Sequence, residues 1–428
     1  MRRGPAAIAA AAVSGLLALT LTACGGDGRP AQGETMKSDV QFRQVALADA
    51  AAAPAVVEAS DAFGLGVLAG ADRDKSVVFS PASAFVALAM LAEGATNDGA
   101  EELDTLLGSS GDDRSEAVDA LMGVLARFEG DPAAVEDEDL PESPLLHLAN
   151  NIVLDDQAQP AQAYLDRLTE FYDSGISTTD LASQEGRAVL DAWVREHTGG
   201  RIEKSAIEPD PYLYLVLQNA VLLAARWQRE FDPSDTAKLP FTSSTGQAQT
   251  AQMMRARHRI GYAQVDGWTA IDLPYQEGFA ARFVLPPVGT DPASIDATTM
   301  AKLASALATA APSTVDVSLP RFDIRSRIDL ANALSGQGLE AIFDRDSGSF
   351  ERIATTLPLW LGKAVQQATI TTGEQGTVAA AVTEIGVMAG SVQPAPEHAF
   401  VADRPFLMVV EETTTGWDLF QTVVRSAE

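Results

Sequence analysis

The stretch that most constrains how this chain can fold is residues 374–383, which read Glu-Gln-Gly-Thr-Val-Ala-Ala-Ala-Val-Thr. Their small side chains let the backbone enter a tight space, because little volume has to be accommodated on the way in. With the two-residue period of a strand, one face is uncharged and the other carries Glu384. The uncharged face consists of Thr377, Ala379, Ala381, Thr383, Ile385 and Val387. We expect a loop that later becomes a strand, with this face buried and the other meeting solvent.

The same stretch also fits a different structure. Alanine is the best helix former, so an alanine-rich amphipathic helix capped near Thr377 satisfies these residues equally well. The ten residues alone are compatible with both the inserting loop and the helix. The rest of the sequence has to decide between these two interpretations.

The chain opens with the pattern of an exported protein. Arg2 and Arg3 precede an apolar run at 6–21 that is too short for a membrane span and typical of a secretory signal. Residues 21–24, Leu-Thr-Ala-Cys, match a bacterial lipobox, in which Cys24 becomes the lipid-modified first residue. Cys24 is the only cysteine, which excludes an intramolecular disulfide and a cysteine-based metal site. The alternative is an ordinary cleaved signal with an incidental Cys24.

Composition divides the chain into three parts. We expect a lipoprotein signal peptide at 1–23, a flexible tether at 24–55 and a single domain at 56–428. The formal net charge of −29 leaves no basic surface to neutralise phosphates, so nucleic acid is excluded as a partner. The acidic residues at 128–144 predict a solvated loop. Their spacing lacks the glycine and ligand alternation of a calcium loop.

A strand, a turn and a helix are predicted near residue 80. Residues 77–83, Val-Val-Phe-Ser-Pro-Ala-Ser, lead into a run at 84–94 with apolar residues at helical spacing. Ser80 and Pro81 suit the start of this helix, because a hydroxyl can accept free backbone N–H groups and proline is tolerated in the first turn.

Further fragments follow along the chain. They are Leu-Ala-Asn-Asn-Ile at 148–152, Trp-Val at 193–194, Thr-Gly-Gly-Arg-Ile at 198–202, Leu-Val-Leu-Gln-Asn-Ala at 215–220, Leu-Pro-Arg-Phe at 319–322 and Asp-Arg-Pro-Phe-Leu at 403–407. In this order, and together with residues 77–83 and 374–383, they resemble the serpin family over about residues 56–424. The chain is similar to an inhibitory bacterial serpin.

The resemblance implies an α+β fold with three β-sheets, eight or nine helices and an exposed reactive-centre loop. A target protease would attack this loop as a substrate, and the freed hinge would insert into the main sheet before water releases the acyl-enzyme. The implied hinge residues are Glu374, Gly376, Thr377, Ala379, Ala380, Ala381 and Thr383. A polar cluster beneath the opening sheet is implied at Ser80, Ser83, Asn219 and Gln366. Gln366 stands where the family often has histidine, which argues against a pH switch there.

The resemblance also places the reactive bond. Counting forward from Glu374 by the usual hinge length gives Gly390–Ser391, whereas counting back from Phe400 moves the bond about two residues later. The residue before the cut can therefore be Met388, Ala389, Gly390 or Val392. No Lys or Arg occurs between Gln375 and Ala402. A trypsin-like protease would find no cation for its specificity pocket, so the expected target is an elastase-like or subtilisin-like serine protease.

Enzyme motifs are absent from the sequence. It contains no G-x-S-x-G, H-E-x-x-H, complete P-loop or zinc-spaced cysteine set, and its four histidines are scattered. We therefore expect an inhibitor without cofactor or metal, monomeric, extracytoplasmic and held to the membrane through Cys24. Two alternatives remain open. One is a non-inhibitory serpin-fold binding protein at the cell surface, and the other is an acidic surface enzyme with an unrecognised site.

Overall fold

The computed structural model describes residues 34–135, 140–354, 356–377 and 395–427, and every structural statement below concerns these residues. Eight α-helices lie within them. They are α1 (Ala53–Ala69), α2 (Pro81–Ala92), α3 (Asn97–Leu106), α4 (Gly111–Leu125), α5 (Gln162–Tyr172), α6 (Gln184–His197), α7 (Ala297–Thr309) and α8 (Leu330–Ser335).

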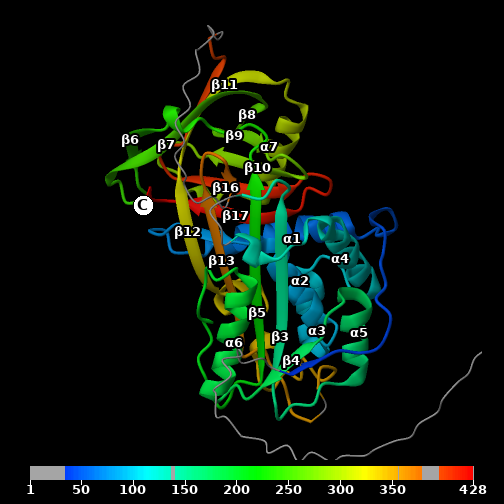
Figure 1. Cartoon of the computed structure of the whole chain (residues 1–428). Helices are drawn as coiled ribbons and strands as arrows, with labels where there is room; N and C mark the ends of the chain where they lie inside the picture. Colours follow the sequence, from blue (N-terminus) through cyan, green and yellow to red (C-terminus); the bar gives the residue numbers. More distant parts are fainter. Residues whose placement is uncertain (1–33, 136–139, 355, 378–394, 428) are drawn as a thin grey trace, which may run out of the picture. The chain divides into compact units, whose positions relative to one another are not determined.

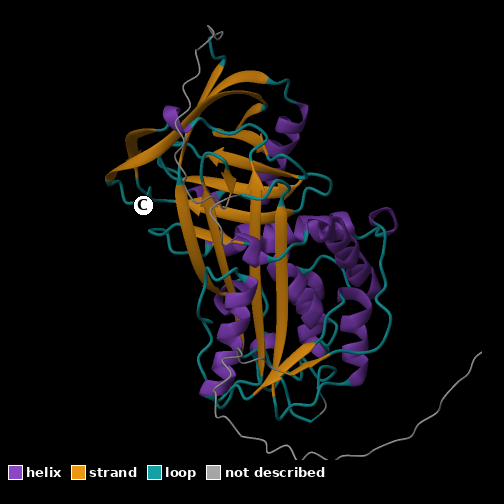
Figure 2. Ribbon diagram, in the orientation of Figure 1, coloured by secondary structure: helices purple, strands orange, loops and turns teal. Residues whose placement is uncertain are grey.

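The strands form three sheets (Figures 1 and 2). The seven-stranded sheet contains, in spatial order, β1 (Glu34–Met36), β4 (Ile176–Thr179), β3 (Leu145–Asp155), β5 (Leu215–Arg226), β14 (Gly376–Thr377), β13 (Lys363–Thr372) and β12 (Phe322–Asp329). The six-stranded sheet contains β2 (Val77–Phe79), β17 (Asp418–Val424), β16 (Phe406–Glu412), β10 (Phe279–Leu285), β9 (Trp268–Pro274) and β8 (Tyr262–Val265). The four-stranded sheet contains β15 (His398–Val401), β11 (Ser313–Pro320), β7 (Ala248–Ile260) and β6 (Ala237–Thr242). The predicted α+β class with three sheets is confirmed.

Helix α2 is the buried centre of the fold. All twelve of its residues are buried, which matches a sequence rich in Ala, Val, Leu and Phe on every side of the helix. The Ser80 hydroxyl accepts the Ser83 backbone N–H at 3.3 Å, and Pro81 occupies the first turn. The helix start predicted from the sequence is confirmed.

The two faces of the seven-stranded sheet are covered by different helices. Successive side chains of a strand point to opposite faces, and neighbouring residues of β5 show this directly. Gln218 donates to the Leu190 carbonyl of α6 at 3.2 Å, whereas Asn219 donates to the Ser83 hydroxyl of α2 at 2.5 Å. Helix α2 therefore packs on the core face, and α6 lies along β5 and β3 on the opposite face (Figure 1).

The predicted tether is corrected in its second half. Residues 34–36, which we placed in a flexible segment, form β1 and pair antiparallel with the edge strand β4. Further along, the Val45 N–H donates to Asp119 at 2.5 Å, and α1 begins at Ala53 instead of after residue 55. Edge pairing uses backbone groups, so a stretch with little apolar content can still dock there. Composition alone could not reveal this contact.

Candidate functional site

The seven-stranded sheet is parted at one end by the start of the predicted hinge. Over most of their common length, β13 and β5 pair directly and in parallel, from Lys363 opposite Val216 to Ala368 opposite Val221. Beyond this region β14 lies between them. Gly376 pairs with Arg226 and Thr377 with Ala225, while Thr377 also pairs with Thr372 of β13. We expected a loop that would enter the sheet later, but Gly376 and Thr377 already form a strand within it.

Gly376 fits because it has no side chain. A Cβ atom at this position would lie 2.0 Å from the carbonyl oxygen of Ala225 on β5, far inside van der Waals contact. The sequence predicted that small residues would let the hinge enter a tight space. At Gly376 this space is tight because the backbones of β14 and β5 approach each other closely. Only glycine can occupy this position without moving one of the two strands.

Thr377 is 1% exposed, so the hinge already buries one of its side chains. Its hydroxyl shares a hydrogen bond with the hydroxyl of Tyr275, and burial raises the pKa of that phenol well above its ordinary value. Tyr275 stacks on Trp227 with ring centroids 4.4 Å apart. The Trp227 indole N–H donates to the Gly373 carbonyl at 2.9 Å. These aromatic rings hold the turn that leads into β14.

Glu374, the first hinge residue, is also buried, with 6% exposure. Its carboxylate accepts the Thr236 hydroxyl at 2.6 Å and the Nε–H of Arg321 at 2.7 Å. A buried carboxylate requires such partners, because the unpaired charge would cost several kcal/mol. The hinge is therefore anchored by an ion pair at the point where it enters the sheet.

The remaining hinge and bond residues cannot be placed. Ala379, Ala380, Ala381, Thr383, Gly390 and Ser391 lie outside the described residues, as does Cys24. The same holds for the predicted exposed reactive-centre loop. For these positions the expectations from the sequence stay predictions.

The four predicted residues of the polar cluster come together between α2, β5 and β13. The Gln366 amide N–H groups donate to the Ser80 carbonyl at 2.9 Å and to Asn219 Oδ1 at 2.6 Å, and its carbonyl oxygen accepts the Ser80 N–H at 2.7 Å. Asn219 also donates to Ser83 and to Asn150 of β3. All four predicted residues are at most 3% exposed. One buried network thus links the helix start to the three central strands.

The opposite face of β5 and β13 is covered in the described part of the sheet, whereas Glu384, whose face we expected to meet solvent, lies outside the described residues. Helix α6 covers β5 there. The segment that follows α6 covers β13, because the Gln367 side chain accepts the Ala206 N–H at 3.1 Å and donates to the Lys204 carbonyl at 3.0 Å. The alternation of charged and apolar residues predicts that two faces differ, but not which neighbouring helix covers them.

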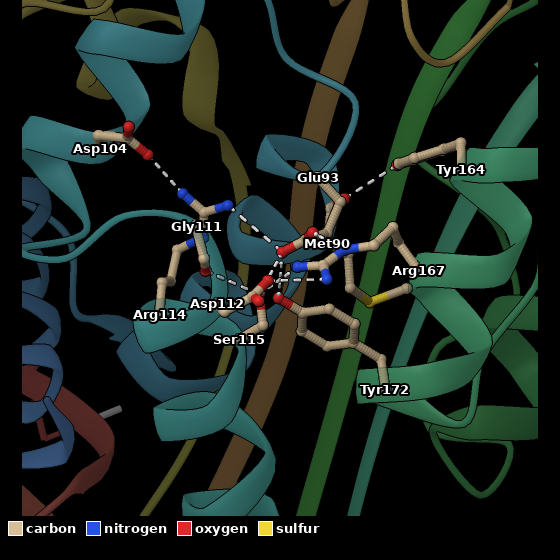
Figure 3. Close-up of polar contacts among 10 residues, drawn as sticks. All are labelled: Met90, Glu93, Asp104, Gly111, Asp112, Arg114, Ser115, Tyr164, Arg167 and Tyr172. Carbon is tan, nitrogen blue, oxygen red and sulfur yellow. Dashed lines mark hydrogen bonds and ion pairs between the residues drawn. The ribbon is translucent and has the colours of Figure 1, made fainter. Parts of the chain in front are cut away.

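A second buried polar cluster, which sequence analysis missed, surrounds the end of α2 (Figure 3). Glu93, with a side chain only 3% exposed, accepts hydrogen bonds from the Ser115 hydroxyl at 2.5 Å and from Arg167 Nε at 2.7 Å. Arg114 and Tyr172 also contact this carboxylate, each at 3.3 Å. Burial and the Glu93 charge both raise the pKa of Tyr172. In the sequence, the only indication of this cluster is the acidic residue Glu93 at the end of an otherwise apolar helix.

Two of the four histidines are also brought together, although they are distant in sequence. His147 on β3 and His197 at the end of α6 form a hydrogen bond between their rings. In contrast, His258 is buried in the four-stranded sheet, and His398 stacks on Tyr262. Calling all four scattered was wrong for this pair.

The sequence and the fold resemble those of known proteins. A sequence profile described as Serpin (serine protease inhibitor) matches residues 60–426. The chain belongs to the serpin family. Serpin B12 of Homo sapiens is 26% identical over 381 residues, which cover 82% of this chain and 93% of that protein. Leukocyte elastase inhibitor of Bos taurus is 27% identical over 362 residues, covering 81% and 91% of the two chains.

Solved serpin structures show the same fold. The native state of tengpin, a thermophilic serpin, superposes with a TM-score of 0.75 at 21% identity, covering 92% of this chain and 100% of that one. Thyroxine-binding globulin in complex with thyroxine gives a TM-score of 0.71 at 23% identity, covering 87% and 99%. Many serpins inhibit serine proteases, whereas thyroxine-binding globulin binds a small molecule. Family membership alone therefore does not assign inhibition to this serpin.

Among the described residues, no group of three or more His, Cys, Asp or Glu side chains is placed to hold a metal ion. No helix there combines the length and the apolar character that a membrane span requires.

Proposed function

We propose that this serpin irreversibly inhibits serine endopeptidases by cleavage of its reactive loop and insertion of the hinge into the seven-stranded sheet. The supporting observation is β14, because its two residues already lie between β5 and β13. Insertion would extend this strand between β5 and β13, beginning from the end of the sheet where the two strands are already separated. It would replace the direct pairing of β13 with β5 by pairing on both sides of a new strand.

The register of β14 predicts where each hinge residue would arrive. Gly376 is opposite Arg226 and Thr377 is opposite Ala225, so antiparallel extension brings Thr383 opposite Asn219. Residues directly opposite each other in such a pair share a face. The Thr383 hydroxyl would therefore reach the polar cluster as Gln366 is moved away from Asn219. A hydroxyl that donates and accepts suits this exchange of partners.

The length of β5 sets the extent of insertion. At the same register, Leu215, the first residue of β5, would face Val387. The predicted reactive bond at Gly390–Ser391 lies just beyond this point, so the whole strand could enter while the protease remains attached at the cut. At roughly 1 kcal/mol per net hydrogen bond, pairing along β5 supplies on the order of 10 kcal/mol. This is enough to distort a bound protease.

The target class follows from the loop composition. The absence of Lys and Arg between Gln375 and Ala402 favours proteases that accept small or apolar residues. The test is incubation with subtilisin and with an elastase, followed by denaturing gel electrophoresis. A covalent complex is the expected result. Cleavage without a complex would support a non-inhibitory serpin scaffold instead, and resistance to both proteases would contradict the proposed loop.

Substitution of Thr383 tests insertion separately from loop recognition. Thr383→Arg would place a charge among Ser80, Ser83 and Asn219, where its desolvation costs several kcal/mol. We expect this variant to be cleaved at the wild-type rate but to release active protease, because slow insertion leaves time for hydrolysis. Thr383→Ser keeps the hydroxyl and should inhibit like the wild type. Equal inhibition by both variants would disprove the predicted register.

We also propose that the protein is exported, lipid-modified at Cys24 and monomeric at the outer side of the cell membrane. The supporting pattern is the apolar run at 6–21 followed by the lipobox at 21–24. Cys24→Ala should move the protein from the membrane fraction to the soluble fraction without changing inhibition by the purified domain. A wild-type protein that is already soluble would refute the anchor.

A further inference from the structure

A pair of histidines joins α6 to the seven-stranded sheet. His147 Nε2 lies 2.9 Å from His197 Nδ1, and the two ring planes differ by only 5°. On its other side, His147 Nδ1 lies 2.6 Å from a carboxylate oxygen of Glu129. The three side chains form a linear chain of hydrogen bonds. It runs from the segment before β3, through β3 itself, to the last residue of α6.

The chain of contacts limits the number of protons that it can hold. A hydrogen bond between two ring nitrogens requires one N–H and one lone pair. With Glu129 accepting from His147 Nδ1–H, a neutral His147 accepts from His197 Nδ1–H, and a charged His147 donates to a neutral His197. In both arrangements at least one ring is neutral. When both rings are protonated, two N–H groups and two positive charges face each other and the contact is lost.

In the described part of the chain, few titratable groups on other elements lie near the end of α6, and His147 and His197 form the contact there that can change with pH. Among the described residues, the charged or titratable groups that act on His197 are His147 from β3 and Glu129 from the segment before 3-10 helix η3 (Pro132–Val135). Helix η3, which packs against α6, carries no titratable side chain. On β5, the residue opposite His147 is Leu222, and the side chain that bonds α6 is the neutral Gln218.

We propose that His147 and His197 form a latch that fastens the end of α6 to β3 at neutral pH and releases it in mild acid. Burial first, and then the neighbouring His147, lower the pKa of His197 from 6.5 to about 4, although Glu129 opposes the shift. A released His197 would bind its proton near the ordinary value of 6.5. The contact is thus fully stabilising above about pH 6.5, and its contribution is lost as the pH falls toward 4.

The latch gains a regulatory role if the proposed insertion mechanism holds. Extended at the register of β14, the hinge would bring Ala380 to the level of Leu222, which is directly opposite His147. Helix α6 covers β5 on the face along which the new strand must pass. Opening of the latch would therefore remove one restraint on insertion, and acid would accelerate insertion at this step.

Trp193 supplies a local signal for the test. Its ring centroid lies 4.6 Å from that of His197, so release or protonation of His197 should change its fluorescence. We expect a transition with a midpoint between pH 4 and 6.5 in the full chain, accompanied by faster hydrogen exchange in the last turn of α6. The Trp193→Phe variant identifies the signal, because it should lack the fluorescence change.

His197→Asn replaces Nδ1 by an amide that can still donate to His147 but does not titrate. We expect this variant to lose both the fluorescence transition and the pH dependence of α6 exchange. His258→Gln is the matched control, because His258 is also buried with its pKa lowered to about 4 but lies in the four-stranded sheet. It should keep both transitions. Glu129→Gln should move the midpoint to lower pH, since the protonated pair loses its neighbouring anion.

The outcomes separate the latch from the proposed function. If His197→Asn keeps the wild-type transition, or if His258→Gln abolishes it, the latch is refuted whatever the protein inhibits. If the transition behaves as expected but no protease forms a covalent complex at pH 5 or pH 7.5, the latch stands and the inhibitory function fails.

Discussion

At the scale of single residues, Gly376 determines whether the hinge can begin as a strand. Gly376→Ala would force a methyl group against the Ala225 carbonyl, so either β14 leaves the sheet or β5 shifts. Overpacking of this kind costs about 1–3 kcal/mol. We expect a lower thermal midpoint and faster hydrogen exchange at the end of β5 that pairs with β14.

Gly123→Ala provides the control for this prediction. Gly123 lies inside α4, and a Cβ atom there would meet nothing within 4 Å. Because alanine favours a helix interior over glycine, the variant should gain about 0.5–1 kcal/mol of stability. Opposite signs for the two substitutions are the expected result. A gain in stability for Gly376→Ala would show that β14 does not depend on the close backbone approach.

Residue patterns explain which local features could be predicted from the sequence. The helix start at Ser80 and Pro81 depends on neighbours within one turn, so its pattern is visible in the chain itself. The small residues of the hinge likewise reveal a tight passage. In contrast, the contact of His147 with His197 depends on where α6 ends over β3. No sequence spacing encodes that position, and the pair was therefore missed.

At the scale of elements, α2 is held at both ends by buried polar networks. Ser80 and Ser83 join its start to the parted sheet, and Glu93 joins its end to α4 and α5. Glu93→Gln would leave Arg114, which is only 3% exposed, without one of its two carboxylate partners. Breaking a buried ion pair costs about 3–5 kcal/mol. We expect a large loss of unfolding free energy in urea.

Glu101→Gln on the neighbouring helix α3 is the control, because its side chain is exposed. A surface change of this kind should alter stability by no more than about 0.5 kcal/mol. If both variants changed the unfolding free energy by a similarly small amount, the buried ion pair of Glu93 with Arg114 would not contribute significantly to stability. The cluster could not be predicted from the sequence because the partners of Glu93 come from α4 and α5, and only the fold brings them to the end of α2.

At the scale of the whole molecule, two buried groups, Asp418 and His197, make folding stability depend on pH in opposite directions. The buried Asp418 side chain contacts Gln421, with Glu411 and Arg282 also acting on it. Burial is the main cause that raises its pKa to about 7, and Glu411 raises it further, whereas Gln421 and Arg282 lower it. The folded state therefore keeps a proton that the unfolded chain releases near pH 4. Its contribution to stability is present below pH 4 and is lost as the pH rises through 7. His197 acts in the opposite direction over much of this range.

Asp418→Asn should reduce the contribution to stability that falls with rising pH, and part of it remains because burial also raises the pKa of the neighbouring Asp61. The amide can still accept from Gln421, and it carries no charge to be buried at high pH. We expect a gain of about 1–3 kcal/mol at pH 8 and little change at pH 4, measured by thermal unfolding at both values. Asp346→Asn is the matched control, because it removes one negative charge from an exposed position. If the acidic surface of the molecule caused the loss of stability at high pH, the two variants would gain the same stability at pH 8. A gain confined to Asp418→Asn would assign the effect to the buried carboxylate.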